Sequence, residues 1–274
     1  MYDPSPACAG NGTAPDSSTG LLSPVLVVLI LVAVFVSWVL MRQNHHYPLS
    51  ITRSRAPAGD VVVRLVDARV SSRHLDTIVG SIDCVAVGRD GTLFVCAGSA
   101  VYASTPTHTR LLAGHVREKG LRDGEGEQAR FCTAFGAAVD NAGNIIIADT
   151  KNHCIRKVAS SSGNVETLAG GGGRGERGYR DGYGVDARFD RPHGVAVDQH
   201  GVIYVCDTNN HVVRKLVLTA GACLVSTLAG NREAAKAFDP GQWKMDGVGA
   251  DVTFSFPRGL ALDVDSNLIV ADCR

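Results

Sequence analysis

Three stretches of the chain repeat the same cassette of glycines, aspartates and short apolar runs. The aspartates of the three copies are Asp123, Asp140 and Asp149, then Asp181, Asp198 and Asp207, then Asp246, Asp263 and Asp272. In every copy the first two aspartates lie 17 residues apart and the last two lie 9 apart. A long repeat made of short strand patterns indicates a propeller or a solenoid array.

Each complete copy contains four short apolar, β-rich segments separated by turns. In the middle copy these segments are residues 194–198, 202–206, 211–218 and 225–230. Asp198 and Gly201 between the first two segments supply the chemistry of a tight hairpin, because Asp bonds turn amides and Gly accepts a positive φ. Four antiparallel strands per repeat are typical of a propeller blade. The predicted fold class is therefore an all-β propeller of about four four-stranded blades.

The two ends of the repeat array match only parts of a blade. A degenerate copy at residues 84–114 keeps the strand spacing but has Gly88 and Ala97 where the other copies have aspartates. Farther upstream, residues 61–66 and 75–80 match only third and fourth strands, whereas residues 259–272 match only first and second strands. Pairing of the two ends would close a ring and hide its sheet edges. The alternatives are an open array and two chains that associate to complete a ring.

The anchors of the cassette resemble those of a known repeat. Asp-Gly-x-Gly, Ala-x-Phe, Pro-x-Gly-Val-Ala-Val-Asp and Ile-Arg-Lys-Val follow one another in that order. This series resembles the NHL repeat of six-bladed β-propellers, over roughly residues 60–274 and most strongly from Asp123 onward. The resemblance implies the fold, but propellers of this type include scaffolds, RNA readers and enzymes, so it does not select a function.

The N-terminal part divides into three segments before the propeller. Residues 1–20 are rich in small and polar residues and are expected to be a disordered tail. Residues Leu21 to Met41 contain no charge and are long enough for a transmembrane helix. Residues 42–59 are interpreted as a linker, and residues 60–274 as the propeller. A cleaved signal peptide is the competing interpretation, but a basic n-region and an Ala-x-Ala-like site are both missing.

Flanking charge predicts the orientation of this single-pass anchor. Arg42, Arg53 and Arg55 follow the apolar segment, and no basic residue precedes it. The positive-inside rule then places the propeller in the cytosol and the N-terminus outside or in a lumen. The sequon at Asn11 is a predicted glycosylation site on that outer side, which agrees with this orientation.

Composition narrows the classes of partner. The chain has 27 basic and 27 acidic residues, so no global field favours nucleic acid. Seven of the eight cysteines lie in the propeller region, without a Cys-x-x-Cys pair, which favours reduced thiols over a disulfide framework. Cys96 and Cys206 occupy one strand position in two copies and are expected to be small buried hydrophobes. No cofactor or metal is expected.

Two patterns that suggest chemistry have simpler interpretations. Residues 173–178 spell Gly-x-Gly-x-x-Gly, but another turn follows where a dinucleotide site requires a helix, so an inter-blade loop is expected. The recurring aspartates are expected to close hairpins, because a catalytic site is normally singular. His153 and His211 also recur, and both are expected at turns or strand edges rather than as ligands.

The most promising site is the second residue of the Pro-x-Gly anchor, which enters the strand that lines a propeller's central channel. Phe135, His193 and Arg258 occupy this position, with Arg191 beside them. The amidating lyase of neuropeptide processing resembles this fold and binds zinc with histidines from several such positions, whereas only His193 matches here. A gluconolactonase-like centre would need a cluster of carboxylates, which is not found. Trp243, in the long connection 231–245, is a further candidate binding residue.

The sequence thus predicts a single-pass, membrane-anchored propeller that serves as a protein-binding or scaffold module without catalytic activity. A metal-dependent propeller enzyme, of the amidating-lyase or gluconolactonase kind, is the first alternative. Binding of single-stranded RNA at the channel face is the second, and the neutral charge balance disfavours it.

Overall fold

The computed structural model describes residues 49–55, 61–67, 78, 81–105, 107–219, 221–236 and 247–273, and only the backbone of the first two ranges. The predicted tail, the predicted transmembrane segment, Asn11 and Trp243 lie outside these ranges. Among the described residues, no helix has the length and apolar character needed to span a bilayer.

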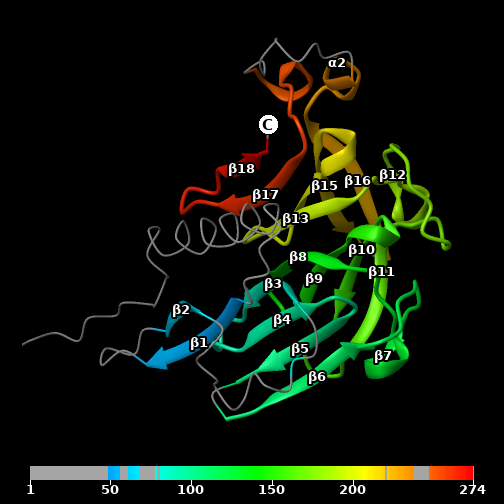
Figure 1. The fold of residues 1–274 in the computed structure, drawn as a ribbon. Helices are drawn as coiled ribbons and strands as arrows, with labels where there is room; N and C mark the ends of the chain where they lie inside the picture. Colours follow the sequence, from blue (N-terminus) through cyan, green and yellow to red (C-terminus); the bar gives the residue numbers. More distant parts are fainter. Residues whose placement is uncertain are drawn as a thin grey trace, which may run out of the picture.

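The described chain forms antiparallel sheets whose strands, apart from the edge strands β7 and β12, lie in sequence order (Figure 1). Blade 1 consists of β3 (Ile82–Val87), β4 (Leu93–Ala97), β5 (Ala100–Ser104) and β6 (Thr109–Gly114). Blade 2 consists of β8 (Ala134–Val139), β9 (Ile145–Asp149), β10 (Cys154–Val158) and β11 (Asn164–Gly170), with β7 (Gly124–Glu125) at its outer edge. Blade 3 consists of β13 (Pro192–Val197), β14 (Ile203–Asp207), β15 (Val212–Thr219) and β16 (Ala222–Ala229), with β12 (Gly182–Tyr183) at its edge. A half-blade of β17 (Pro257–Leu262) and β18 (Leu268–Asp272) follows. The predicted all-β class and the four-stranded blades are confirmed.

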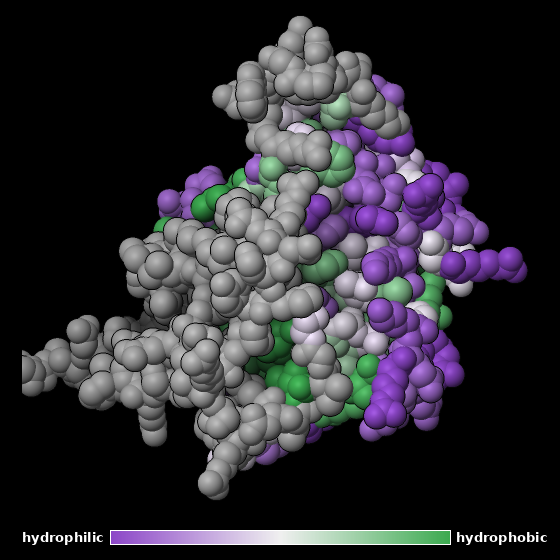
Figure 2. Space-filling model, in the orientation of Figure 1, coloured by the Kyte–Doolittle hydropathy of each residue, from purple (hydrophilic) through white to green (hydrophobic). Residues whose placement is uncertain are grey.

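The remaining elements are short. A helix, α2 (Arg232–Lys236), follows blade 3, and single 3-10 turns lie at η1 (Gly126–Gln128), η2 (Thr150–Asn152), η3 (Gly184–Asp186), η4 (Thr208–Asn210) and η5 (Gly249–Asp251). On the side of the molecule where β7, β11 and β12 lie, the surface is mostly hydrophilic (Figure 2), as expected for the solvated outer edges of blades.

The blades stack through their faces, with the first strands β3, β8, β13 and β17 next to one another (Figure 1). Strand β9 shows why the sequence produces this stack. Ile145 and Ile147 pack into a core shared with blade 1, whereas Ile146 and Ala148 pack into a core shared with blade 3. Successive side chains of a strand point to opposite faces, so a continuous apolar run fits a sheet that is covered on both sides. Cys96 and Cys206 are fully buried, as predicted.

The N-terminal strands differ from the expected composite blade. Strand β2 (Val61–Asp67) pairs with β1 (Leu49–Arg55), and the two form a separate two-stranded sheet. The strand β1 lies within the segment interpreted as a linker. A hairpin between neighbouring strands closes a short loop, which costs less conformational entropy than pairing β2 with a strand two hundred residues away. No sheet in the described part joins the two ends, and ring closure stays a prediction.

The middle aspartate of each cassette closes a hairpin, as predicted. Asp140 Oδ1 accepts hydrogen bonds from the backbone N–H groups of Ala142 and Asn144, at 2.9 and 2.8 Å. Asp198 and Asp263 do the same in their own turns. Blade 1 lacks an aspartate at this position, and Asp90, two residues further on, bonds Thr92 instead.

In blades 2 and 3 the outer two aspartates of the cassette have another role, and for them the hairpin interpretation is wrong. Asp246 of the third cassette lies outside the described residues. In blade 2 the two aspartates hold a fully buried arginine: Arg156 Nη1 donates to Asp149 Oδ2 at 2.9 Å, and Nη2 donates to Asp123 Oδ1 at 2.6 Å. The guanidinium also lies over the Phe131 ring, 5.0 Å from its centroid. Blade 3 repeats this clamp around Arg214 with Asp207 and Asp181. The recurring arginine therefore explains two of the three recurring aspartates.

Candidate functional site

Four side chains occupy one register position along the neighbouring first strands. They are the second residues of β3, β8, β13 and β17, namely Asp83, Phe135, His193 and Arg258, and we call them the mouth row. The last three were predicted from the sequence. Asp83 was not, although an alignment of Cys84 with the glycine of Pro-x-Gly identifies it.

The glycine that follows Phe135 and His193 explains why β8, β13 and β17 lie so close together, whereas blade 1 has Cys84 at this position. A Cβ built on Gly136 would overlap the carbonyl oxygen of His193 in the next blade. On Gly194 it would lie 2.5 Å from the carbonyl oxygen of Arg258. Only glycine allows backbones to approach this closely. The Pro-x-Gly anchor therefore sets the spacing of the mouth row.

His193 is the best-defined member of the row. Its ring stacks on that of Phe135, with centroids 5.1 Å apart and planes inclined by 17°. Its Nδ1 lies 2.8 Å from the carbonyl oxygen of Arg191. A carbonyl oxygen can only accept, so Nδ1 carries the proton and Nε2 retains a lone pair. Burial lowers the pKa of His193 to about 4, and the nearby charges of Arg258 and Arg191 act in the same direction. The imidazole is therefore neutral at pH 7.

A second histidine fixes the backbone beside His193. His153 Nδ1 accepts a hydrogen bond at 3.0 Å from the N–H of Arg191, which has a φ of 51°. The same contact joins His211 to Phe256 one blade later, at 3.2 Å. Both histidines follow 3-10 turns in the left-handed conformation. They lie at turns, as predicted, and connect successive blades.

Charge is distributed unevenly along the mouth row. Asp83 accepts a hydrogen bond at 2.8 Å from the N–H of Gly98, and burial raises its pKa while Lys119 and Lys151 act to lower it. Arg191 and Arg258 lie near His193, where their charges lower its pKa. The structure thus brings four of the five predicted binding residues into one region, the fifth being the undescribed Trp243.

Two other sequence-based interpretations concern loops and metals. The segment containing Gly173 to Gly178 forms a tight loop in which the N–H of Glu176 bonds the carbonyl of Gly171 at 2.8 Å, and no helix follows it. This agrees with an inter-blade loop. Within the described ranges, no three His, Cys, Asp or Glu side chains are grouped as metal ligands.

The low pKa of His193 predicts a specific dependence of stability on pH. The unfolded imidazole takes up a proton below about pH 6.5, whereas the folded one stays neutral until about pH 4. The stability that neutral His193 contributes is therefore complete above pH 6.5 and is lost as the pH falls towards 4. From pH 7 to pH 5 we expect wild-type protein to lose about 1–2 kcal/mol more stability than His193→Gln.

Urea unfolding of both proteins at the two pH values measures this difference. Contributions from Asp149 and Asp207, whose pKa values burial raises to about 6, have the opposite sign but are common to both proteins and cancel. An equal pH dependence in the two proteins would show that His193 titrates normally in the folded state.

Comparison with known proteins identifies the repeat. The family model described as the NHL repeat matches residues 131–158 and 189–216, which contain the first three strands of blade 2 and nearly all of those of blade 3. The chain contains NHL repeats in these two stretches. The resemblance predicted from the sequence is thus confirmed.

The curated relatives that match the chain are much longer than the chain itself. Protein SUPPRESSOR OF QUENCHING 1, chloroplastic, from Arabidopsis thaliana is 33% identical over 120 residues, which are 41% of this chain and 11% of the relative. NHL repeat-containing protein 2 from Homo sapiens is 40% identical over 86 residues, which are 31% of this chain and 11% of the relative. The chain therefore matches only about a tenth of the length of these relatives.

A solved structure supports the fold. A structural genomics protein of unknown function from Bacteroides thetaiotaomicron aligns with a TM-score of 0.56 and 18% identity, covering 82% of this chain and 54% of that chain. At this identity the similarity concerns the fold alone.

Proposed function

We propose that this NHL-repeat chain is a non-catalytic protein-binding module whose partner docks on the mouth row. The main observation is His193: a neutral imidazole stacked on Phe135, with Nδ1 bonded to the backbone and Nε2 left as an acceptor. A group with a pKa of about 4 is a weak base at neutral pH, so it is suited to accept a hydrogen bond rather than to remove a proton from a substrate.

The neighbours of His193 suggest what the partner presents. Arg191 and Arg258 favour a carboxylate, since a guanidinium can bind both oxygens of a carboxylate at once. Phe135 supplies an aromatic surface, and aromatic and arginine side chains dominate the energetics of protein interfaces. A polypeptide with an acidic side chain next to an N–H or O–H donor would match all three features.

Selection from a displayed library of random peptides tests this proposal. The full-length protein is the target, and the double variant His193→Ala, Arg258→Ala is the counter-target. We expect enriched peptides that contain Asp or Glu and bind wild-type protein but not the variant. Peptides that bind both proteins equally would contradict the proposed docking site. Turnover of lactone or peptidylglycine substrates that requires added metal would favour the enzyme alternative.

The membrane anchor at Leu21 to Met41 and the cytosolic orientation belong to the same proposal. The uncharged segment and the flanking arginines support them. Glycosidase treatment of the protein in intact membranes, together with protease digestion, tests the orientation. A glycan on Asn11 and a protease-accessible propeller are expected, whereas a protease-protected propeller would place it in a lumen.

A further inference from the structure

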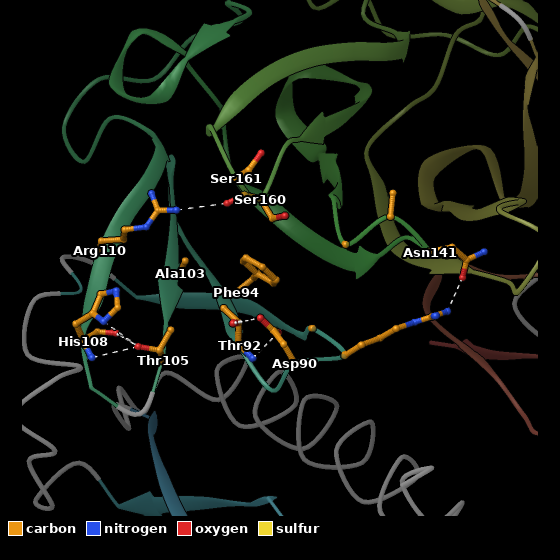
Figure 3. A pocket seen from close by; sticks show the side chains of 14 residues that line it. Asp90, Thr92, Phe94, Ala103, Thr105, His108, Arg110, Asn141, Ser160 and Ser161 are labelled. Carbon is orange, nitrogen blue, oxygen red and sulfur yellow. Dashed lines mark hydrogen bonds between the residues drawn. The ribbon is translucent and has the colours of Figure 1, made fainter. Parts of the chain in front are cut away.

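A cleft of about 560 Å³ lies between blades 1 and 2 (Figure 3) and shares no lining residue with the mouth row. It is lined by β4, β5, β6 and the turn at residues 88–92 of blade 1, and by two turns of blade 2, at residues 141–143 and 160–161. The first of these turns follows the end of β8, whereas Phe135 lies at the start of that strand. The volume is within the range of small-molecule sites, about 300–1,000 Å³.

Basic groups predominate at the rim of this cleft. Arg89, His108 and Arg110 line it, and Asp90 is the only carboxylate among its lining residues. Both oxygens of Asp90 accept hydrogen bonds from Thr92, at 2.9 and 2.8 Å. Neither arginine forms an ion pair with a carboxylate of the described ranges. A concave surface with unbalanced positive charge attracts anions.

The two arginines bridge the blades through neutral groups. Arg89 Nη2 donates to Asn141 Oδ1 at 2.7 Å, and Arg110 Nη2 donates to the carbonyl oxygen of Ser160 at 3.3 Å (Figure 3). A guanidinium has five N–H donors, so these bonds leave most of them for a ligand. The hydroxyls of Ser160 and Ser161 lie on the same wall of the cleft.

The next junction shows that such a bridge needs no charge. Between blades 2 and 3, Asn141 stands at the position of Arg89 and bonds the carbonyl oxygen of Gln199 at 2.8 Å. Glu166 stands at the position of Arg110, four residues before the glycine that ends the fourth strand, and pairs with Lys157. Blade 2 therefore folds and packs without arginine at either position. Packing between blades does not by itself explain the two arginines of blade 1.

The floor of the cleft is apolar. Phe94, which is 4% exposed, and Ala103, which is 6% exposed, form it. We propose that this cleft is a binding site for a small organic phosphate monoester, whose phosphate contacts Arg110 and His108 and whose apolar part rests on Phe94. Arg89, which is bonded to Asn141 across the cleft, adds positive charge without contacting the phosphate. A phosphate has three terminal oxygens that accept from several directions and carries about −1.5 to −2 charge at neutral pH, which suits donors arranged around a rim better than a planar carboxylate does.

Calorimetric titration of the full-length protein with phenyl phosphate tests the site. The variants Arg89→Asn and Arg110→Glu use the residues that blade 2 itself has at these positions, so both are expected to fold, and thermal unfolding checks this. We expect saturable binding that Arg110→Glu weakens about tenfold or more, as loss of a charge-assisted contact predicts. Arg89→Asn is expected to weaken it less, because Arg89 acts on the ligand only through its charge. Arg258→Ala at the mouth row is the matched control and is expected to retain full affinity.

Comparison ligands separate the two parts of the proposal. Benzoate and phenol are expected to bind more weakly than phenyl phosphate, and inorganic phosphate more weakly as well. Equal binding of phenol would overturn recognition of the anion, and equal binding of inorganic phosphate would overturn the role of Phe94. Absence of saturable binding, or full affinity in folded Arg110→Glu, would overturn the site itself.

Discussion

Replacing Arg156 with alanine is expected to lower the free energy of unfolding by about 3–5 kcal/mol, the cost of breaking a buried ion pair by removing one partner. Arg156 is fully buried and bonds both Asp149 and Asp123. Burial raises the pKa of Asp149 to about 6 although the Arg156 guanidinium acts to lower it. Without the guanidinium this pKa would rise further, so the variant would bury either an unpaired carboxylate or a carboxyl group that has to take up a proton, and both cost stability.

The adjacent residue provides the control for this prediction. Lys157 pairs with Glu166 at 3.0 Å on the exposed side of the same strand. Surface pairs of this kind contribute about 0–1 kcal/mol, so Lys157→Ala should have little effect. Urea unfolding of both variants at pH 7 measures the difference. Equal losses in the two variants would mean that the arginine clamp is not a major source of blade stability.

The second large effect is expected from Gly136→Ala. The added methyl group would overlap the carbonyl oxygen of His193, a backbone atom of the next blade that cannot rotate away. Blades 2 and 3 would have to separate, and we expect a loss of about 3 kcal/mol or more, at the upper end of overpacking effects. Thermal and urea unfolding measure this loss.

Gly259→Ala is the matched variant, since Gly259 has the same position in the half-blade. A Cβ there meets one described atom outside its chain neighbours, Ala271 Cβ at 3.0 Å. In the described structure the substitution should cost about 1 kcal/mol or less, because Ala271 has to shift by only a few tenths of an ångström, whereas Gly136→Ala overlaps a backbone atom outright. A loss as large as that of Gly136→Ala would reveal another segment packed against β17, as ring closure or self-association requires.

The features of the fold that depend on short-range interactions, namely the strands and the hairpin turns, were predicted from the sequence. The blades follow from short continuous apolar runs separated by turns, and the hairpin role of Asp140 follows from turn preferences that act within four residues. The role of Asp149 could not be read locally, because its partners Arg156 and Cys132 lie 7 and 17 residues away in sequence. Asp83 was not predicted because its strand, β3, belongs to the degenerate copy, in which the Pro-x-Gly anchor is absent.

The candidate site was predicted as a position but not as a chemical state. The repeat register placed Phe135, His193 and Arg258 together, since the same place in successive blades faces the same region. The stacking of His193 on Phe135 and its bond to the Arg191 carbonyl depend on side-chain geometry across two blades. These contacts keep the imidazole neutral, with Nε2 as a hydrogen-bond acceptor. They cannot be predicted from the order of residue types alone.

The most direct test of the proposed function is the affinity of a selected acidic peptide for wild-type protein, for Arg258→Ala and for Arg110→Ala, measured by calorimetry. If the partner docks on the mouth row, Arg258→Ala should weaken binding by tenfold or more, since removing a residue central to an interface typically costs about 2 kcal/mol or more, while Arg110→Ala should leave it unchanged. Unchanged affinity in folded Arg258→Ala would contradict docking at the mouth row.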